Sequence, residues 1–190
     1  MPIVERNPLP RIPMDTREQL YDWLARHHRD EPGFWLVQWR SVTGRRVIAY
    51  EDVIEVCLIF GWIDSTVQTL DEQRSAIRLT PRRPTSVWSK SNKQRLARLE
   101  SAGLMQPAGL AAVEAAKVNG MFNFLDDVEA LEVPEDLAAA LGGLRDVFDG
   151  FPPGRRRQLL YWIKSAKRPG TRSARIAKIV ADAGQGRSST

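Results

Sequence analysis

The chain has 190 residues, of which 43% are hydrophobic and 27% charged, and its formal net charge is +5. This composition excludes wholesale disorder, and no apolar run approaches the roughly 20 residues of a membrane-spanning helix. The lone Cys57 excludes an intrachain disulfide and any multi-cysteine metal site, which fits a reducing compartment. The first residues lack a signal-peptide pattern, so we expect a cytoplasmic protein without a membrane span.

The charges are segregated along the chain. Residues 82–98 hold six basic side chains and no acidic one, residues 126–149 hold eight acids against one arginine, and residues 151–190 hold ten basic residues against one acid. This pattern indicates an anionic ligand, a nucleic acid, or a charge match between the segments themselves.

The first half of the chain predicts helices around a small sheet. Residues 1–14 are rich in proline and are expected to form an extended arm, and a capping-box pattern that begins at Asp15 opens the first helix. Aromatic and β-branched residues then predict strands, with one helix between them. The strands are expected at residues 34–40 and 46–49 and in a hairpin of residues 66–70 and 76–80, and the helix at residues 51–60.

The second half reads as helical. A second capping-box pattern begins at Ser91, and Pro107 suits the first turn of the next helix. Further helices are expected at residues 134–141, at 155–167 and from Thr171, as N-cap, to about 184. The fold class is therefore α+β, predominantly helical, with a small antiparallel sheet. We expect a single domain over residues 15–184, whose C-terminal helical part is 134–184, and a disordered tail at 185–190.

The basic segment before the helix from Ser91 is the main candidate for a binding site. It combines forked guanidinium donors, hydroxyls and an indole on a loop, an inventory that suits phosphate, carboxylate or a stacked planar group. Asn92 lies between Leu96 and Leu99 in helical angle and is expected to point inward. The candidates in this segment are Arg82, Arg83, Ser86, Trp88, Ser89, Lys90 and Asn92.

Two arginines of the last helix are the second part of the candidate site. Arg172 falls within the apolar stripe of Ile176 and Ile179, and Arg175 lies at its edge. A guanidinium on an inward face needs an acid, a carbonyl or a bound anion, since an unpaired buried charge is costly. Arg172 is therefore either an anion contact or half of an ion pair with the acidic segment.

Asp64 follows a glycine that ends a helix, and it either orients one of the arginines or acts as a functional carboxylate. The neighbouring His27 and His28 lack partners at metal-ligand spacing, so local solvation or capping is the preferred interpretation. No catalytic or metal-binding motif occurs, so we assign no catalytic residue, no metal and no cofactor, and leave enzymatic activity undecided.

Several motifs resemble the YdeI/OmpD-associated (OmdA-like) family over residues 15–183. They include Phe60-Gly61-Trp62-Ile63-Asp64-Ser65, Thr80-Pro81-Arg82-Arg83-Pro84, Ser86-Val87-Trp88-Ser89-Lys90-Ser91-Asn92 and Ala166-Lys167-Arg168-Pro169 with Thr171-Arg172. The resemblance implies a bacterial bacteriocin-protection or antimicrobial-stress protein, and supplies no reaction and no catalytic residue.

The leading hypothesis is a stress-protection protein that binds an anionic small molecule or an acidic protein surface through the basic loop, with Arg172 or Arg175 converging on it. One alternative is an enzyme of unknown reaction that uses Asp64 beside this loop. Another is a nucleic-acid-binding protein that uses the basic C-terminal helices. The sequence does not fix the oligomeric state.

Overall fold

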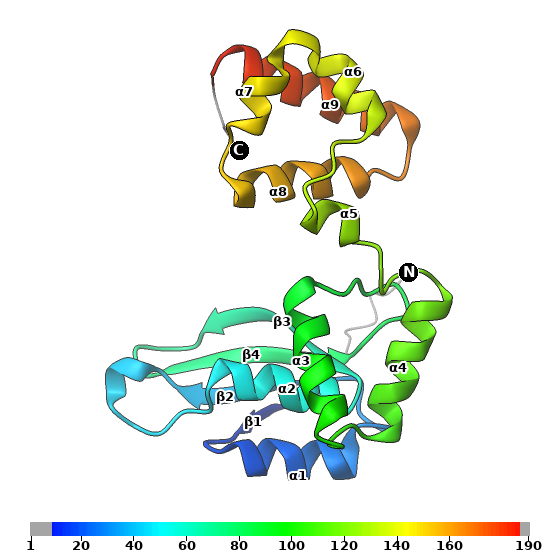
Figure 1. Cartoon of the computed structure of the whole chain (residues 1–190). Helices are drawn as coiled ribbons and strands as arrows, with labels where there is room; N and C mark the ends of the chain where they lie inside the picture. Colours follow the sequence, from blue (N-terminus) through cyan, green and yellow to red (C-terminus); the bar gives the residue numbers. More distant parts are fainter. Residues whose placement is uncertain (1–8, 187–190) are drawn as a thin grey trace, which may run out of the picture. The chain divides into compact units, whose positions relative to one another are not determined.

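The computed structural model describes residues 9–186, and contacts between residues divide the chain after Phe122 into two compact units (Figure 1). The sequence predicts one domain over 15–184, whereas each unit has a hydrophobic core of its own. Residues 1–8 of the expected arm and 187–190 of the expected tail lie outside the described residues.

The first unit contains a four-stranded sheet and four α-helices among its described residues. The strands are β1 (Arg11–Pro13), β2 (Phe34–Trp39), β3 (Trp62–Thr69) and β4 (Arg74–Pro81). The helices are α1 (Arg17–His27), α2 (Tyr50–Ile59), α3 (Lys90–Ser101) and α4 (Pro107–Val118), with a short 3-10 turn at Ser41–Thr43. The predicted first strand, second helix and hairpin are all present.

The sheet is mixed, which corrects the prediction of an antiparallel one. Its strand order is β1-β2-β4-β3; β2 and β3 both run antiparallel to β4, whereas β1 runs parallel to β2. Strand β1 comes from the segment predicted as an extended arm, and its prolines are tolerated because it is an edge strand.

The predicted strand at residues 46–49 is wrong. Residues 45–49 have no regular secondary structure, and β2 is already paired with β1 on one side and β4 on the other. A returning strand would therefore have no free edge of β2 to pair with.

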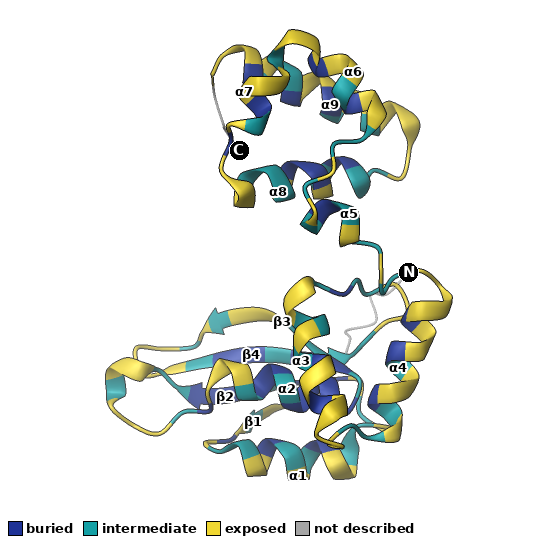
Figure 2. Cartoon of the chain, in the orientation of Figure 1, coloured by how far each residue is buried: buried dark blue, intermediate teal, exposed yellow. Residues whose placement is uncertain are grey.

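One face of the sheet carries the core of the first unit. The directly opposed pairs Phe34 with Leu79 and Leu36 with Ile77 are all buried. Helix α2 lies across this face and buries Val53 and other apolar side chains against it (Figures 1 and 2). This packing also brings the first residue of α2 close to β3.

The helix starts are shifted from the predicted ones. Thr16, and not Asp15, caps α1, and its hydroxyl and Gln19 form the capping box. Ser89, and not Ser91, caps α3 by accepting a hydrogen bond from the backbone N–H of Asn92. Helix α9 begins at Pro169, ahead of Thr171, because proline at the first helical position needs no N–H partner.

The second unit is helical throughout its regular elements. These are α5 (Asp126–Glu129), α6 (Glu135–Leu141), a 3-10 turn at Gly142–Leu144, α7 (Arg145–Asp149), α8 (Pro153–Lys164) and α9 (Pro169–Gly184). The predicted inward residues Ile176 and Ile179 are buried with Leu137, Phe148 and Ile163. The α+β class with a predominance of helix is thus confirmed. None of the helices in the described part of the chain is long and apolar enough to cross a membrane.

Candidate functional site

A hollow of about 520 Å³ in the first unit brings together residues of the β3–β4 hairpin and the basic loop that follows it. We call it the arginine hollow. Four predicted site residues line it, namely Asp64, Arg82, Arg83 and Ser86. The other lining residues are Pro32, Ile63, Ser65, Arg78, Thr80, Pro81 and Pro84. The volume lies in the range of small-molecule sites.

Asp64 is placed by the register of the hairpin. It lies opposite Leu79, on the face that α2 covers, just before an irregularity in the pairing of β3. The hydroxyl of Tyr50, the first residue of α2, donates a hydrogen bond to Oδ2 of Asp64. This bond raises the pKa of Tyr50 to about 12, so Tyr50 keeps its proton at neutral pH and offers no base.

Arg82 is largely buried and rests on an aromatic ring. Its guanidinium carbon lies 3.9 Å from the centre of the Trp88 ring, and Nη1 approaches the carbonyl of Val87 at 3.4 Å. Burial lowers the pKa of Arg82 to about 10, so it remains a cation at neutral pH in an environment that disfavours the charge. The stacking fixes the plane of the guanidinium.

A tight turn holds the basic loop. The backbone N–H of Ser86 donates to the carbonyl of Arg83, and the backbone N–H of Arg83 donates to the Ser86 hydroxyl. The side-chain amide of Asn119, beyond the end of α4, donates to the carbonyl of Pro84 at 2.8 Å. The loop is therefore anchored at both ends of the turn.

The arginines of this hollow have no acidic partner among the described residues. Within residues 9–186, Arg78, Arg82 and Arg83 form no ion pair, and the buried Nε atoms of Arg78 and Arg82 have no hydrogen-bond partner. By contrast, α1, α2 and α3 are tied by ion pairs that Arg17, Arg95 and Arg98 make with acids of α2. Guanidiniums that no carboxylate neutralises, next to a concave surface, are suited to an anion.

The remaining predicted residues of the segment have structural positions. Trp88 is only 2% exposed and packs against Phe122, so its fixed ring provides the surface on which the Arg82 guanidinium stacks. Ser89 caps α3, and Asn92 is half-buried as predicted, where its side-chain oxygen accepts from Arg95. Lys90 is exposed at the first residue of α3 and is not among the lining residues.

Arg172 and Arg175 lie in the second unit and have partners there. Arg172 donates to both oxygens of Asp136, at 2.6 and 2.8 Å. Arg175 donates to the carbonyl of Trp162 and to the Ser165 hydroxyl. The ion-pair interpretation of Arg172 is therefore the one the structure favours.

Other basic residues of the second unit also pair with acids of segment 126–149. The pairs are Lys164 with Asp127, Arg156 with Asp149 and Arg157 with Glu129. The predicted charge match between the acidic and basic segments is confirmed, and it weakens the case for a continuous nucleic-acid-binding face.

Sequence reasoning missed Arg78 and Tyr50. Arg78 lies between the buried Ile77 and Leu79 in β4, so its side chain points to the other face of the sheet. A charged residue in a strand that leads directly into the basic loop could have identified it as a candidate. Tyr50 gave no such signal, because its contact with Asp64 depends on how α2 packs on the sheet.

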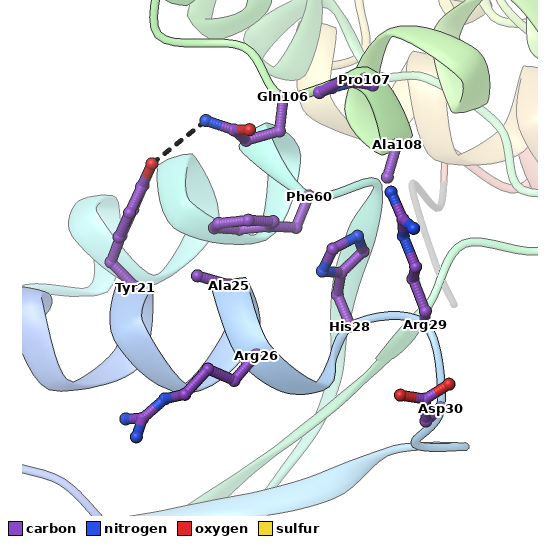
Figure 3. Close-up of a pocket in the computed structure, with 10 residues that line it drawn as sticks. All are labelled: Tyr21, Ala25, Arg26, His28, Arg29, Asp30, Phe60, Gln106, Pro107 and Ala108. Atoms are coloured by element: carbon purple, nitrogen blue, oxygen red, sulfur yellow. Dashed lines mark hydrogen bonds between the residues drawn. The ribbon is translucent and has the colours of Figure 1, made fainter.

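A second hollow, of about 440 Å³, lies between α1 and the start of α4 (Figure 3). Its aromatic wall is formed by Tyr21, His28 and Phe60, and the rings of Tyr21 and His28 each contact that of Phe60. The ring Nδ1 of His28 donates to the carbonyl of Leu24, which is the local capping role that the sequence predicted. Arg29 extends beside His28 toward Ala108, the second residue of α4 (Figure 3). This hollow contains none of the predicted ligand-binding residues.

Two family models match the chain, one in each unit. Residues 12–112, more than half of the chain, match a domain of unknown function (DUF8412), so the first unit belongs to that family. Residues 130–186 match the model described as Bacteriocin-protection, YdeI or OmpD-Associated. The second unit thus matches the YdeI/OmpD-associated family. No curated protein and no solved structure matches it.

The two matches refine the resemblance seen in the sequence. The YdeI/OmpD-associated model covers most of the second unit, while the arginine hollow lies in the unit that the other model describes. The chain is thus a bacteriocin-protection-associated protein whose candidate binding surface lies outside the part that carries this description.

Proposed function

We propose that the chain is a bacterial stress-protection protein that binds a small anionic ligand in the arginine hollow of its first unit. Arg78, Arg82 and Arg83 supply the positive charge, and Ser86 lines the same hollow. The observation that carries the proposal is that three arginines line one concave surface and form no ion pair among the described residues.

The geometry does not support the alternative role of these arginines, which is a structural ion pair with Asp64. Asp64 is bonded to Tyr50, and Arg82 is held on Trp88. Charge-assisted hydrogen bonds to an anion contribute about 1.5–3 kcal/mol each, and more in a partly buried site than at the open surface. Three such bonds contribute at most about 9 kcal/mol, which leaves an affinity in the millimolar to submillimolar range after an association cost of about 4 kcal/mol or more.

Calorimetric titration of the full chain with inorganic phosphate tests the proposal. Arg83 is the cleanest position to change, since it is exposed and its side chain makes no ion pair among the described residues. The variant Arg83→Ala should weaken phosphate binding about tenfold, which corresponds to the loss of one charge-assisted bond.

The matched control is Arg29→Ala, which removes an exposed arginine from the second hollow. It should leave the phosphate affinity unchanged. Absence of phosphate binding in the wild-type chain, or a loss that follows Arg29 and not Arg83, would overturn the proposal.

An acidic protein surface is the second form that the ligand can take, because a surface glutamate or aspartate presents the same oxygen acceptors as a small carboxylate. The description of the family links the second unit with bacteriocin protection. We infer that ligand binding in the first unit serves this protective role.

A further inference from the structure

Asp64 is a carboxylate among arginines that does not pair with them. It lines the same hollow as Arg78, Arg82 and Arg83, and only Oδ2 is used, by the Tyr50 hydroxyl. Within the described residues Oδ1 accepts no hydrogen bond from a side chain of this hollow. The hollow therefore has a cationic part and, next to it, a hydrogen-bond acceptor with capacity to spare.

This arrangement disfavours a simple anion and favours a ligand with two kinds of group. A phosphate that fills the hollow near Asp64 would meet like charge, which is repulsive at short range. A hydroxyl group of the ligand placed at Asp64 would instead donate a hydrogen bond to the carboxylate. Ser65, Thr80 and Ser86 also line the hollow. The Ser65 hydroxyl donates to the carbonyl of Arg78 and the Ser86 hydroxyl accepts from the backbone of Arg83, and a hydroxyl has capacity for a further hydrogen bond in each case.

We propose, building on the proposed function above, that the ligand is a phosphate ester of a polyol or sugar, with its phosphate on the arginines and a hydroxyl on Asp64. Three guanidiniums match a phosphate dianion better than a single carboxylate. A hollow of about 520 Å³ also leaves room for more than a bare phosphate.

Two phosphate esters of the same chain length distinguish binding of the phosphate from binding of a hydroxyl. Glycerol 3-phosphate carries two hydroxyls, whereas n-propyl phosphate carries none. In calorimetric titrations the wild-type chain should bind glycerol 3-phosphate about tenfold more tightly, because the ester without hydroxyls covers Oδ1 of Asp64 without donating a hydrogen bond to it.

The variant Asp64→Asn tests the role of the carboxylate directly. The amide oxygen can still accept from Tyr50, while the other oxygen becomes an NH₂ donor and the negative charge is lost. The preference for glycerol 3-phosphate should fall to less than about threefold, and n-propyl phosphate should bind more tightly than in the wild type.

The outcomes distinguish this inference from the proposed function. If the wild type binds both esters equally, with an affinity that Arg83→Ala still weakens, that result would support the anion site and overturn the polyol-phosphate inference. A preference that persists in Asp64→Asn also overturns it. If neither ester binds, the proposed function itself fails.

Discussion

At the scale of single residues, Arg82 shows how a site can conflict with stability. Its guanidinium is largely buried on Trp88 and has no acidic partner among the described residues. Burial disfavours the charged form, as the lowered pKa of about 10 indicates. A charge kept in such a position is typical of binding sites, where function is retained at a cost in stability.

The variant Arg82→Met tests this trade-off. Methionine covers the Trp88 ring with a similar chain length but carries no charge to desolvate, so the variant should be about 1 kcal/mol more stable than the wild type. Urea denaturation measures this, and phosphate binding should be lost in the same variant. A loss of more than about 1 kcal/mol in stability would mean that the charge is paired in the native protein.

The sequence identified Arg82, Arg83, Ser86 and Asp64 as neighbours of one surface, and the structure places them in one hollow. It did not reveal that Trp88 faces the core. Trp88 precedes the helix cap in an irregular segment, where no periodicity indicates the direction of a side chain. Its burial is decided by Phe122, which is 34 positions away in the chain.

At the scale of elements, the close packing of α4 on the end of α2 depends on Gly109. A Cβ atom at this position would lie 2.3 Å from the carbonyl oxygen of Ile59 and 2.7 Å from that of Leu58. These are backbone atoms, so the helices would have to separate.

The variant Gly109→Ala should therefore be destabilised by about 2–3 kcal/mol, although alanine is the better helix former. Gly170→Ala in α9 is the matched control, since nothing lies within 4 Å of its added Cβ. The control should be neutral or slightly stabilised in thermal unfolding. Equal behaviour of the two variants would contradict this account of the α2–α4 contact.

The pair between Asp136 and Arg172 links α6 to α9 and makes stability depend on pH. The hydrogen bonds from Arg172 hold the pKa of Asp136 below its ordinary value of 3.8. Because the folded state binds the proton less readily, the contribution is present above about pH 4 and is lost as the pH falls through the lowered value.

Replacing Asp136 by asparagine should thus cost roughly 0.5–1 kcal/mol at neutral pH, the range for a partly exposed pair. The difference from the wild type should vanish once the pH falls below the lowered pKa of Asp136, as measured by denaturant unfolding across pH. A difference that persists at the lowest pH would assign the effect to the amide itself.

Local patterns predicted most elements but not their pairing. The helices at 51–60 and 155–167 and the hairpin followed from periodicity and turn residues. The parallel strand β1 was missed, because a three-residue edge strand rich in proline has no pattern of its own and forms only against β2.

At the scale of the whole molecule, the two units have separate hydrophobic cores. No pattern in the sequence indicates the boundary after Phe122. Residues 119–125 contain aromatic side chains in place of the glycine, proline and serine of a typical linker. The two family matches leave residues 113–129 between them, in agreement with the boundary.

Separate cores predict that a ligand of the arginine hollow stabilises only the first unit. At 100 times its dissociation constant, phosphate should raise the stability of the first unit by about 2.7 kcal/mol. Hydrogen-exchange mass spectrometry along a denaturant series, read on peptides from each unit, measures this. Equal protection of peptides from both units would contradict a site confined to the first.

The central claim, that the arginines of the hollow bind an anion, is tested most directly by NMR of the arginine Nε–H groups. The Nε atoms of Arg78 and Arg82 have no protein partner among the described residues, whereas Nε of Arg172 is bonded to Asp136. During titration with phosphate, the Nε–H signals of Arg78, Arg82 and Arg83 should shift together and saturate at one dissociation constant, while that of Arg172 stays in place. Signals of the hollow that do not move, or shifts centred on Arg29, would contradict the account.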